Sequence, residues 1–325
     1  MQFHTLKAEE TLENHPCLYS LKRLLYLVVH EHCIERNDVT EHKVRFPKPL
    51  DFFWLLRLNR TVMVAMITGA AAFTADAGVA NALWMTLAAW CLAVGGFSLD
   101  FYADRDLDAE GPRAEMRHNP LTDGSLSPLV GLTFSMTFIA VSFVTTLLIA
   151  PWALLPWGII LAIIVGLALH FFERPLTRAL TLGLLQGLYV LMGSASGHLS
   201  PGLGLLAGMF FFAMFGGRGM IDIRDFPQDT VTRVQTLPKR YGVRRTAQFT
   251  AFCLLIAYIL SLAVYFTGEF SPIYLYLDLA FIAVGLVCAW LFATRPSPRL
   301  AYILTLVCMM GMGSLICLAM ILGSM

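Results

Sequence analysis

Two groups of aspartates have the spacing and the oxygen atoms to bind divalent metal ions. The first lies in the segment SLDFYADRDLDAE (98–110) and consists of Asp100, Asp104 and Asp108. Each member follows the last by four residues, and a helix turns by about 100° per residue, so the three carboxylates would share one helix face. The segment directly follows an apolar run that is long enough to be a membrane span.

The second group lies far downstream, in the segment DIRDFPQD (222–229), and consists of Asp222, Asp225 and Asp229. This i, i+3, i+7 spacing again predicts one helix face. Pro227 stands between the last two members, and proline can end a helix because it lacks a backbone N–H. The chain therefore carries two carboxylate stripes, each at the end of an apolar run.

Such stripes need a cation, because two like charges about 4 Å apart repel by roughly 4 kcal/mol at an effective dielectric constant near 20. Hard oxygen ligands favour Mg²⁺, which takes one or two carboxylates per site and completes its shell with water and substrate phosphates. Basic residues near both stripes could bind those phosphates: Arg57, Arg60, Arg113, Arg117, Arg218, Lys239 and Arg240. Together these residue types predict a site for Mg²⁺ and a diphosphate.

A single stripe of mixed aspartate and arginine has a simpler interpretation. It can be a solvated, salt-bridged helix end, and such exposed pairs contribute little to stability. Two stripes on the same side of a helix bundle, each among basic residues, favour a ligand site over this alternative.

The amino-acid composition indicates the environment of the chain that carries these two stripes. Of the 325 residues, 57% are hydrophobic and 14% charged, and the mean hydropathy is +0.68. These values predict a membrane protein in a lipid bilayer. The net charge of +1 gives no reason to expect a nucleic-acid partner, and the seven cysteines show no ligand or disulfide spacing.

Nine apolar runs are long enough to cross a bilayer, which takes about 20 residues each. They cover residues 54–75, 79–99, 128–149, 153–172, 178–197, 201–217, 246–267, 272–293 and 299–322. All 23 basic residues lie before or at the start of the first run, or at the same side in and beside the connections that follow even-numbered runs. By the positive-inside rule, the N-terminus and both carboxylate stripes are cytoplasmic, and the C-terminus lies on the opposite side.

The fold predicted from these runs is an all-α membrane protein with nine transmembrane helices around a central cavity and a cytoplasmic cap of loop helices. This domain would occupy residues 51–325. Residues 1–50 would form a cytoplasmic extension, in which Leu18, Leu21, Leu25 and Val28 predict an amphipathic helix too short to span.

The residues around both stripes resemble the UbiA-type intramembrane prenyltransferases over about residues 50 to 325. The family's first motif, NDxxDxxxD, is similar to DFYADRDLD (100–108), and its RPLxxGxxSP is similar to NPLTDGSLSP (119–128). Its second acidic motif and the TLP segment after it are similar to DIRDFPQD (222–229) and QTLPKRYG (235–242). Either acidic motif alone would be a weak signal, whereas the four segments together are specific.

Three positions depart from the family pattern. Asp100 stands in place of the family's Asn, Phe101 in place of Asp, and Asn119 in place of the Arg before Pro-Leu. Asp100 keeps a metal-ligand oxygen, Phe101 removes one carboxylate, and Asn119 removes one phosphate contact. These departures leave the prenyl substrate and the acceptor open.

The resemblance implies Mg²⁺-dependent transfer of a prenyl group from an allylic prenyl diphosphate to an acceptor, most simply an aromatic precursor of a lipophilic quinone or pigment. It implies that both aspartate groups hold the metal ions. Six basic side chains would bind the diphosphate: Arg60, Arg113, Arg117, Arg218, Lys239 and Arg240. Three further side chains would stabilise the allylic cation or line the acceptor pocket: Tyr102, Gln186 and Tyr189. Intramembrane Asp278 is either a further functional candidate or a helix-to-helix link.

Three other activities remain open at this stage. A terpene cyclase of the same fold would capture the cation with the substrate's own double bonds, and a related transferase would use a glycerol or sugar phosphate as its acceptor. A cation-coupled transporter could bind ions at the acidic stripes. Transporters, however, usually place such groups near the membrane midplane on broken helices, and these stripes stand at one surface.

Overall fold

The computed structural model describes residues 49–110, 119–122, 124–172, 174–229 and 235–325. All regular secondary structure in these residues is helical, as the sequence predicts. The helices are α3 (Pro49–Leu56), α4 (Leu58–Thr74), α5 (Val79–Glu110), α6 (Pro128–Ile149), η1 (Pro151–Ala153), α7 (Leu154–Ala168), α8 (Pro175–Ser194), α9 (Pro201–Asp229), α10 (Leu237–Tyr241), α11 (Val243–Tyr265), α12 (Pro272–Thr294), α13 (Pro298–Leu306), η2 (Val307–Met312) and α14 (Gly313–Gly323). The amphipathic helix predicted within residues 1–50 lies outside the described residues.

Within the described part of the chain, seven helices are long and apolar enough to cross a membrane, and they match the second to eighth predicted spans. The first predicted span is interrupted, because Arg57 has a left-handed backbone (φ 43°, ψ 50°) that separates α3 from α4. A π-helical turn, η2, divides the last predicted span. The number nine and the cytoplasmic cap stay predictions.

Local sequence explains where several helices begin. Proline stands at the first position of α6, α8, α9, α12 and α13, where its missing N–H costs no hydrogen bond. Ser127 and Ser297 cap α6 and α13, because their side chains accept hydrogen bonds from the N–H groups of Val130 and Leu300. By contrast, α9 passes Pro227 and ends only at Asp229.

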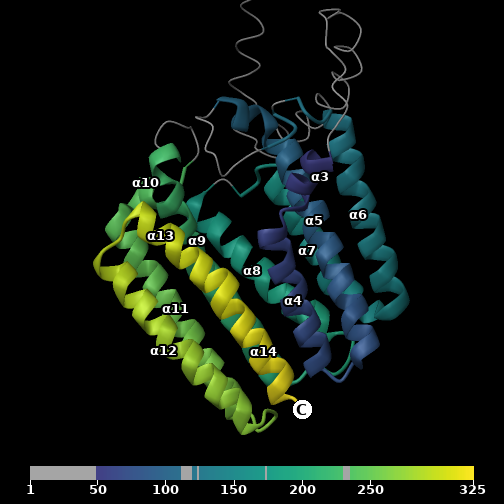
Figure 1. The fold of residues 1–325 in the computed structure, drawn as a ribbon, viewed down its shortest axis with the longest axis vertical. Helices are drawn as coiled ribbons and strands as arrows, with labels where there is room; N and C mark the ends of the chain where they lie inside the picture. The colour runs from purple at the N-terminus through teal and green to yellow at the C-terminus, as the bar shows by residue number, and fades with distance from the viewer. Residues whose placement is uncertain (1–48, 111–118, 123, 173, 230–234) are drawn as a thin grey trace, which may run out of the picture.

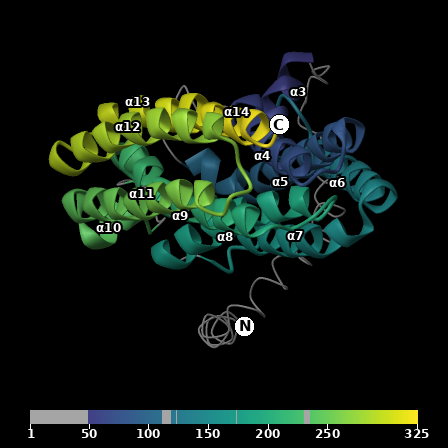
Figure 2. The ribbon, with the colours of Figure 1, turned by 90° about the horizontal axis from the view of Figure 1, so that it is seen from below.

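The helices form a ring with a second group packed against it. Going round the ring, α4, α8, α9, α11, α12 and α14 each contact the next, and α14 contacts α4 again. Helices α5, α6 and α7 pack against the α4 and α8 side. Seen along the bundle, α12, α13 and α14 form one row that faces α11, α9 and α8 (Figure 2).

Helix α8 holds the two sides of the ring together through glycines. A Cβ atom on Gly193 would lie 2.2 Å from the backbone oxygen of Thr68 on α4. A Cβ atom on Gly187 would lie 2.9 Å from the backbone oxygen of Ala207 on α9. Such close approach of backbones is typical of helices packed in membranes. It fixes the spacing between α4 and α9.

Both carboxylate-bearing helices reach the same end of the bundle. Figure 1 shows α5 and α9 extending to the upper end, where α3 and α10 also lie, while the C-terminus lies at the lower end. Helix α5 continues beyond its apolar run to Glu110, and α9 continues to Asp229. The prediction that the stripes lie on helical extensions of two spans is therefore confirmed for the backbone.

Candidate active site

A cavity of about 900 Å³, which includes the space at its open mouth, lies inside the ring of helices. Its wall is mostly apolar, with Arg60, Gln186 and Tyr258 among its few polar side chains. This lining is typical of a site for a small molecule that is mainly hydrocarbon.

The cavity leads from the acidic end of the bundle toward the middle of the membrane. On α9 it is lined from Ile221 to Met209, which is about 18 Å along the helix at 1.5 Å per residue. Ile221 directly precedes Asp222, and the lining residue Gly217 directly precedes Arg218. Arg218 and Asp222 of α9 therefore adjoin the end of the cavity that is nearest the aspartates, which we call its mouth.

Asp222 is the best-anchored member of the second carboxylate group. Its side chain is only 2% exposed. One carboxylate oxygen lies 2.7 Å from Nη2 of Arg218, one helical turn earlier. The other accepts a hydrogen bond of 3.1 Å from the backbone N–H of Leu237. Leu237 belongs to the QTLPKRYG segment, so this segment folds back onto the acidic motif and places α10 beside the mouth.

Asp225 is also buried, and its partner is the preceding residue. Arg224 donates hydrogen bonds from Nε and Nη2 to the two carboxylate oxygens, at 2.8 and 2.9 Å. Such bidentate pairs fix the orientation of a carboxylate. The backbone of Asp229 ends α9, and its side chain lies outside the described part of the structure.

The first carboxylate group is held by residues from other elements. Asp100 lies 3.6 Å from Nη1 of Arg57, at the junction of α3 and α4. Oδ1 of Asp104 lies 3.5 Å from Nε2 of His170, which follows α7. Both aspartates are half-buried. Asp108 lies in the last turns of α5, and its side chain is outside the described part.

The three positions that depart from the family pattern belong to one cluster. The guanidinium of Arg57 stacks 3.7 Å from the ring centroid of Phe101 while it pairs with Asp100. Buried Asn119 donates a 3.1 Å hydrogen bond to the backbone oxygen of Phe101 and accepts one of 3.0 Å from the N–H of Leu121. The three departures are therefore linked through contacts with Arg57 and with the backbone of Phe101.

The predicted phosphate-binding residues fall into three sets. Arg60 lines the cavity and lies 5.8 Å from the ring centroid of Phe97, and half-buried Arg218 pairs with Asp222. On α10, Lys239 is half-buried and Arg240 exposed. Two predicted residues, Arg113 and Arg117, lie outside the described part. The structure therefore brings Arg60 and Arg218 to the cavity mouth.

The described carboxylates are suited to Mg²⁺ as ligands. Among the described residues, no three His, Cys, Asp or Glu side chains come together as a complete metal cage. Mg²⁺ does not need one, since it is typically bound through one or two carboxylates with water and substrate phosphates. The carboxylates of Asp104, Asp222 and Asp225 each have a partner and lie on helices that reach the same end of the bundle, which fits that requirement.

The predicted pocket residues are divided between the cavity and the surrounding core. Gln186 lines the cavity. Tyr189 is buried in a separate core cluster with Met85 and Trp157. Tyr102 packs with Phe101 in a small cluster under α3, where Arg105 stacks on its ring at 5.0 Å. Neither tyrosine is among the residues that line the cavity.

Two buried polar residues beyond these sets have different surroundings. Asp278 of α12 is fully buried and accepts a 2.5 Å hydrogen bond from Ser261 of α11, which is the helix-to-helix link considered above. Tyr258 of α11 lines the cavity, although the sequence analysis did not single it out. In the sequence, Tyr258 could have been noticed as a tyrosine in the middle of the seventh predicted span. In the structure it packs against Phe281 and Gly285 of α12.

Comparisons with known proteins give a consistent result. Residues 61–320 match the UbiA prenyltransferase family. A digeranylgeranylglyceryl phosphate synthase from Natronomonas pharaonis is 30% identical over 226 residues, which are 68% of this chain and 79% of the relative. A protoheme IX farnesyltransferase from Desulforudis audaxviator is 26% identical over 228 residues, 67% of this chain and 69% of the relative.

Solved structures show the same fold. A structure of digeranylgeranylglyceryl phosphate synthase superposes with a TM-score of 0.67 at 20% identity and covers 85% of this chain and 98% of its own. A UbiA homologue from Archaeoglobus fulgidus, bound to DMAPP and Mg²⁺, gives a TM-score of 0.65 at 18% identity and covers 82% and 99%.

Proposed function

The chain belongs to the UbiA prenyltransferase family, and from this premise we propose the reaction, ligands and orientation of its site. The protein is an integral membrane prenyltransferase that transfers a prenyl group from an allylic prenyl diphosphate to a lipophilic acceptor, with Mg²⁺ as its cofactor. One observation carries the proposal: the paired side chains of Asp222 and Arg218 adjoin an apolar cavity that Arg60 lines.

The metal-binding residues are the two aspartate groups, with Asp100, Asp104 and Asp108 on α5 and Asp222, Asp225 and Asp229 on α9. When bound there, Mg²⁺ supplies positive charge to the diphosphate oxygens and makes the diphosphate a better leaving group. Support comes from the buried geometry of Asp222 and Asp225, and from the Archaeoglobus homologue, which binds Mg²⁺ and DMAPP.

The chain's own residues would position the donor and shield the cation formed from it. Arg60 and Arg218 would hold diphosphate oxygens at the mouth, joined by Lys239 and Arg240 from α10. The apolar wall would take up the hydrocarbon tail and exclude water from the allylic carbon after the C–O bond breaks. Gln186, on the same wall, is the polar group best placed to orient an acceptor.

The proposal includes the domain bounds and the orientation of the chain in the membrane. Residues 51–325 form the catalytic domain with nine spans, counting α4 and the α13–η2–α14 run as the shorter ones. A cytoplasmic cap would include α10. The N-terminus and the site face the cytoplasm, as the placement of basic residues supports.

Two acceptor classes deserve a test. An aromatic precursor of a quinone or pigment follows from the sequence analysis. A glycerol phosphate lipid is the second candidate, favoured by the 30% identity to a digeranylgeranylglyceryl phosphate synthase and by the cationic side chain of Arg60 on the cavity wall.

Product analysis tests this function. The purified full chain is incubated with Mg²⁺ and prenyl diphosphates of ten, fifteen or twenty carbons, with an aromatic acid, with a glycerol phosphate lipid, or with neither. Mass spectrometry should find a prenylated acceptor in one of the first two mixtures only. A cyclised hydrocarbon without any acceptor would show a cyclase instead, and ion counterflow without products would show a transporter.

A further inference from the structure

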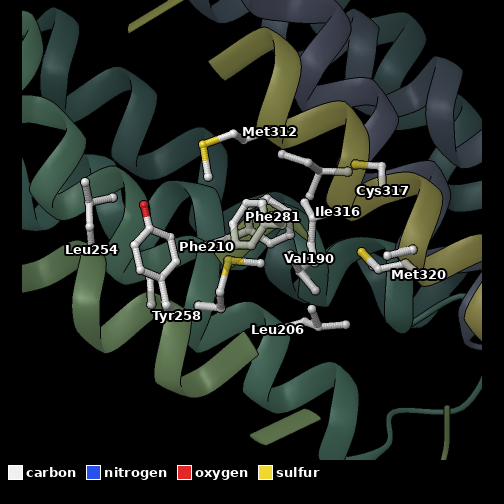
Figure 3. Packing of buried hydrophobic residues seen from close by; sticks show 14 of the residues in the cluster. Val190, Leu206, Phe210, Leu254, Tyr258, Phe281, Met312, Ile316, Cys317 and Met320 are labelled. Carbon is white, nitrogen blue, oxygen red and sulfur yellow. The ribbon is translucent and has the colours of Figure 1, made fainter. Parts of the chain in front are cut away.

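Tyr258 lines the deep part of the cavity on the α11 side. On this helix the cavity is lined by Leu254 and Tyr258, and Tyr258 lies one turn further from the acidic end. Its ring packs edge-on against Phe281 of α12, with ring centroids 5.6 Å apart. Figure 3 shows Tyr258 beside Leu254, with its hydroxyl end toward the side of Met312. A hydrocarbon chain that enters at the mouth therefore meets this ring near the end of its path.

The ring of Tyr258 is seated on a glycine. A Cβ atom on Gly285 of α12 would lie 2.4 Å from both Cζ and Oη of Tyr258, which is closer than any side chain could tolerate. The absence of a side chain at Gly285 therefore lets the ring lie against α12. Any larger residue at position 285 must push the ring toward the cavity.

The hydroxyl group of Tyr258 makes no hydrogen bond among the described residues, although it is buried. Packing, and not hydrogen bonding, therefore holds the ring in place. The hydroxyl adds length to the ring at the point where it meets Gly285. This gives a matched control, because phenylalanine keeps the ring and removes only the group that lacks a partner.

We propose that Tyr258, seated on Gly285, sets the depth of the hydrocarbon cavity and thereby the longest prenyl chain that the protein accepts. This inference rests on the proposed function, since it assigns the hydrocarbon specificity of that same site. Chains that end before the ring fit the cavity, and longer chains must displace it. In hydrophobic pockets, a difference of one methylene changes selectivity by roughly 10- to 200-fold.

The test compares Tyr258→Ala, Tyr258→Phe and Gly285→Ala in the full chain. For each protein, binding of non-hydrolysable thiolodiphosphates with prenyl chains of ten, fifteen and twenty carbons is measured alongside product formation from the matching diphosphates. Tyr258→Ala should raise the preference for the next longer chain by roughly tenfold or more. Gly285→Ala should shift the preference to a shorter chain, and Tyr258→Phe should keep the wild-type order.

Two further variants distinguish a change in cavity depth from misfolding. Tyr258→Trp should shorten the preferred chain without any change on α12. In the double variant Tyr258→Ala/Gly285→Ala, the profile of Tyr258→Ala should return, because Gly285 acts through the ring. An unchanged chain-length order in folded Tyr258→Ala and Tyr258→Trp overturns the inference. Binding without transfer to any acceptor would overturn the proposed reaction alone, because the order of binding still decides the role of Tyr258.

Discussion

The two carboxylate groups at the acidic end of the bundle are held in different ways. On α9, Asp222 and Asp225 are buried and paired with Arg218 and Arg224 of the same helix. On α5, Asp100 and Asp104 are half-buried and pair with residues from other elements.

The difference shows how one site can combine a rigid half with an adjustable half. Buried pairs on one helix keep their geometry when neighbouring helices shift, whereas the α5 pairs change whenever α4 or the segment after α7 moves. We therefore expect the α9 group to be preorganised for the diphosphate. The α5 group would adjust its position when the donor binds.

Removal of the Asp222 side chain should lower the stability of the protein more than substitution of Asp104, Asn119 or Asp100. Asp222→Ala would remove a buried carboxylate from its pair with half-buried Arg218, and breaking a buried ion pair costs up to about 3–5 kcal/mol of folding free energy. Thermal unfolding of the purified protein in detergent measures this cost. Replacement of both partners by Arg218→Met and Asp222→Leu should recover much of the stability but no activity. A cost below about 1 kcal/mol for Asp222→Ala would make the two groups energetically alike.

Asp104 should separate activity from stability. Because its carboxylate is half-buried, Asp104→Ala should change the folding free energy by about 1 kcal/mol or less. Diphosphate release should nevertheless fall by about 10²- to 10³-fold, as when a group that stabilises developing charge is removed. A matched control is Asp76→Asn at the opposite end of the bundle, where an exposed residue with φ 58° tolerates asparagine. Near-normal release by Asp104→Ala would exclude it from the metal site.

Substitution of buried Asn119 should lower the stability of the protein by an intermediate amount. Asn119→Ala would leave the backbone oxygen of Phe101 and the N–H of Leu121 without their hydrogen-bond partner, at a cost of about 1–3 kcal/mol. Asn119→Arg, which brings in the residue of the family motif, should be no better, because a guanidinium cannot accept the hydrogen bond from Leu121. Thermal unfolding of the two variants checks this. A fully stable Asn119→Arg variant would show that the position is not structural.

The two groups also differ in how far the sequence could predict them. Helical spacing was enough to predict that both aspartate groups stand on helices, because α5 and α9 continue as regular helices beyond their apolar runs. Spacing also brought Arg218 and Asp222 together, since they are four residues apart. The backbone contact from Leu237 to Asp222 depends on a chain reversal that has no local period in the sequence.

Tertiary contacts explain what the sequence did not predict. Nothing in the periodicity of residues 54–75 indicates that Arg57 is left-handed, yet this turn shortens the first span and aims Arg57 at Asp100 and Phe101. Likewise, Tyr189 looked like a pocket residue because it is polar within a span, but its rotation about α8 places it in a separate core cluster.

Loss of the Arg57–Asp100 pair should have the smallest effect on folding free energy, in contrast to loss of the Arg218–Asp222 pair on α9. Both side chains are partly exposed, so a double-mutant cycle of Arg57→Ala and Asp100→Ala should give a coupling of about 1 kcal/mol or less in folding free energy.

The same double-mutant cycle, measured as affinity for the prenyl diphosphate donor, tells which role Asp100 plays. If Asp100 mainly holds Arg57, the two single variants weaken binding equally, the double variant adds nothing, and Asp100→Asn behaves like Arg57→Ala. If Asp100 mainly binds metal, its loss raises the Mg²⁺ requirement whether or not Arg57 is present. The first result would make the α5 group a two-aspartate site with a structural arginine anchor, whereas the second would make it a three-aspartate site like its counterpart on α9.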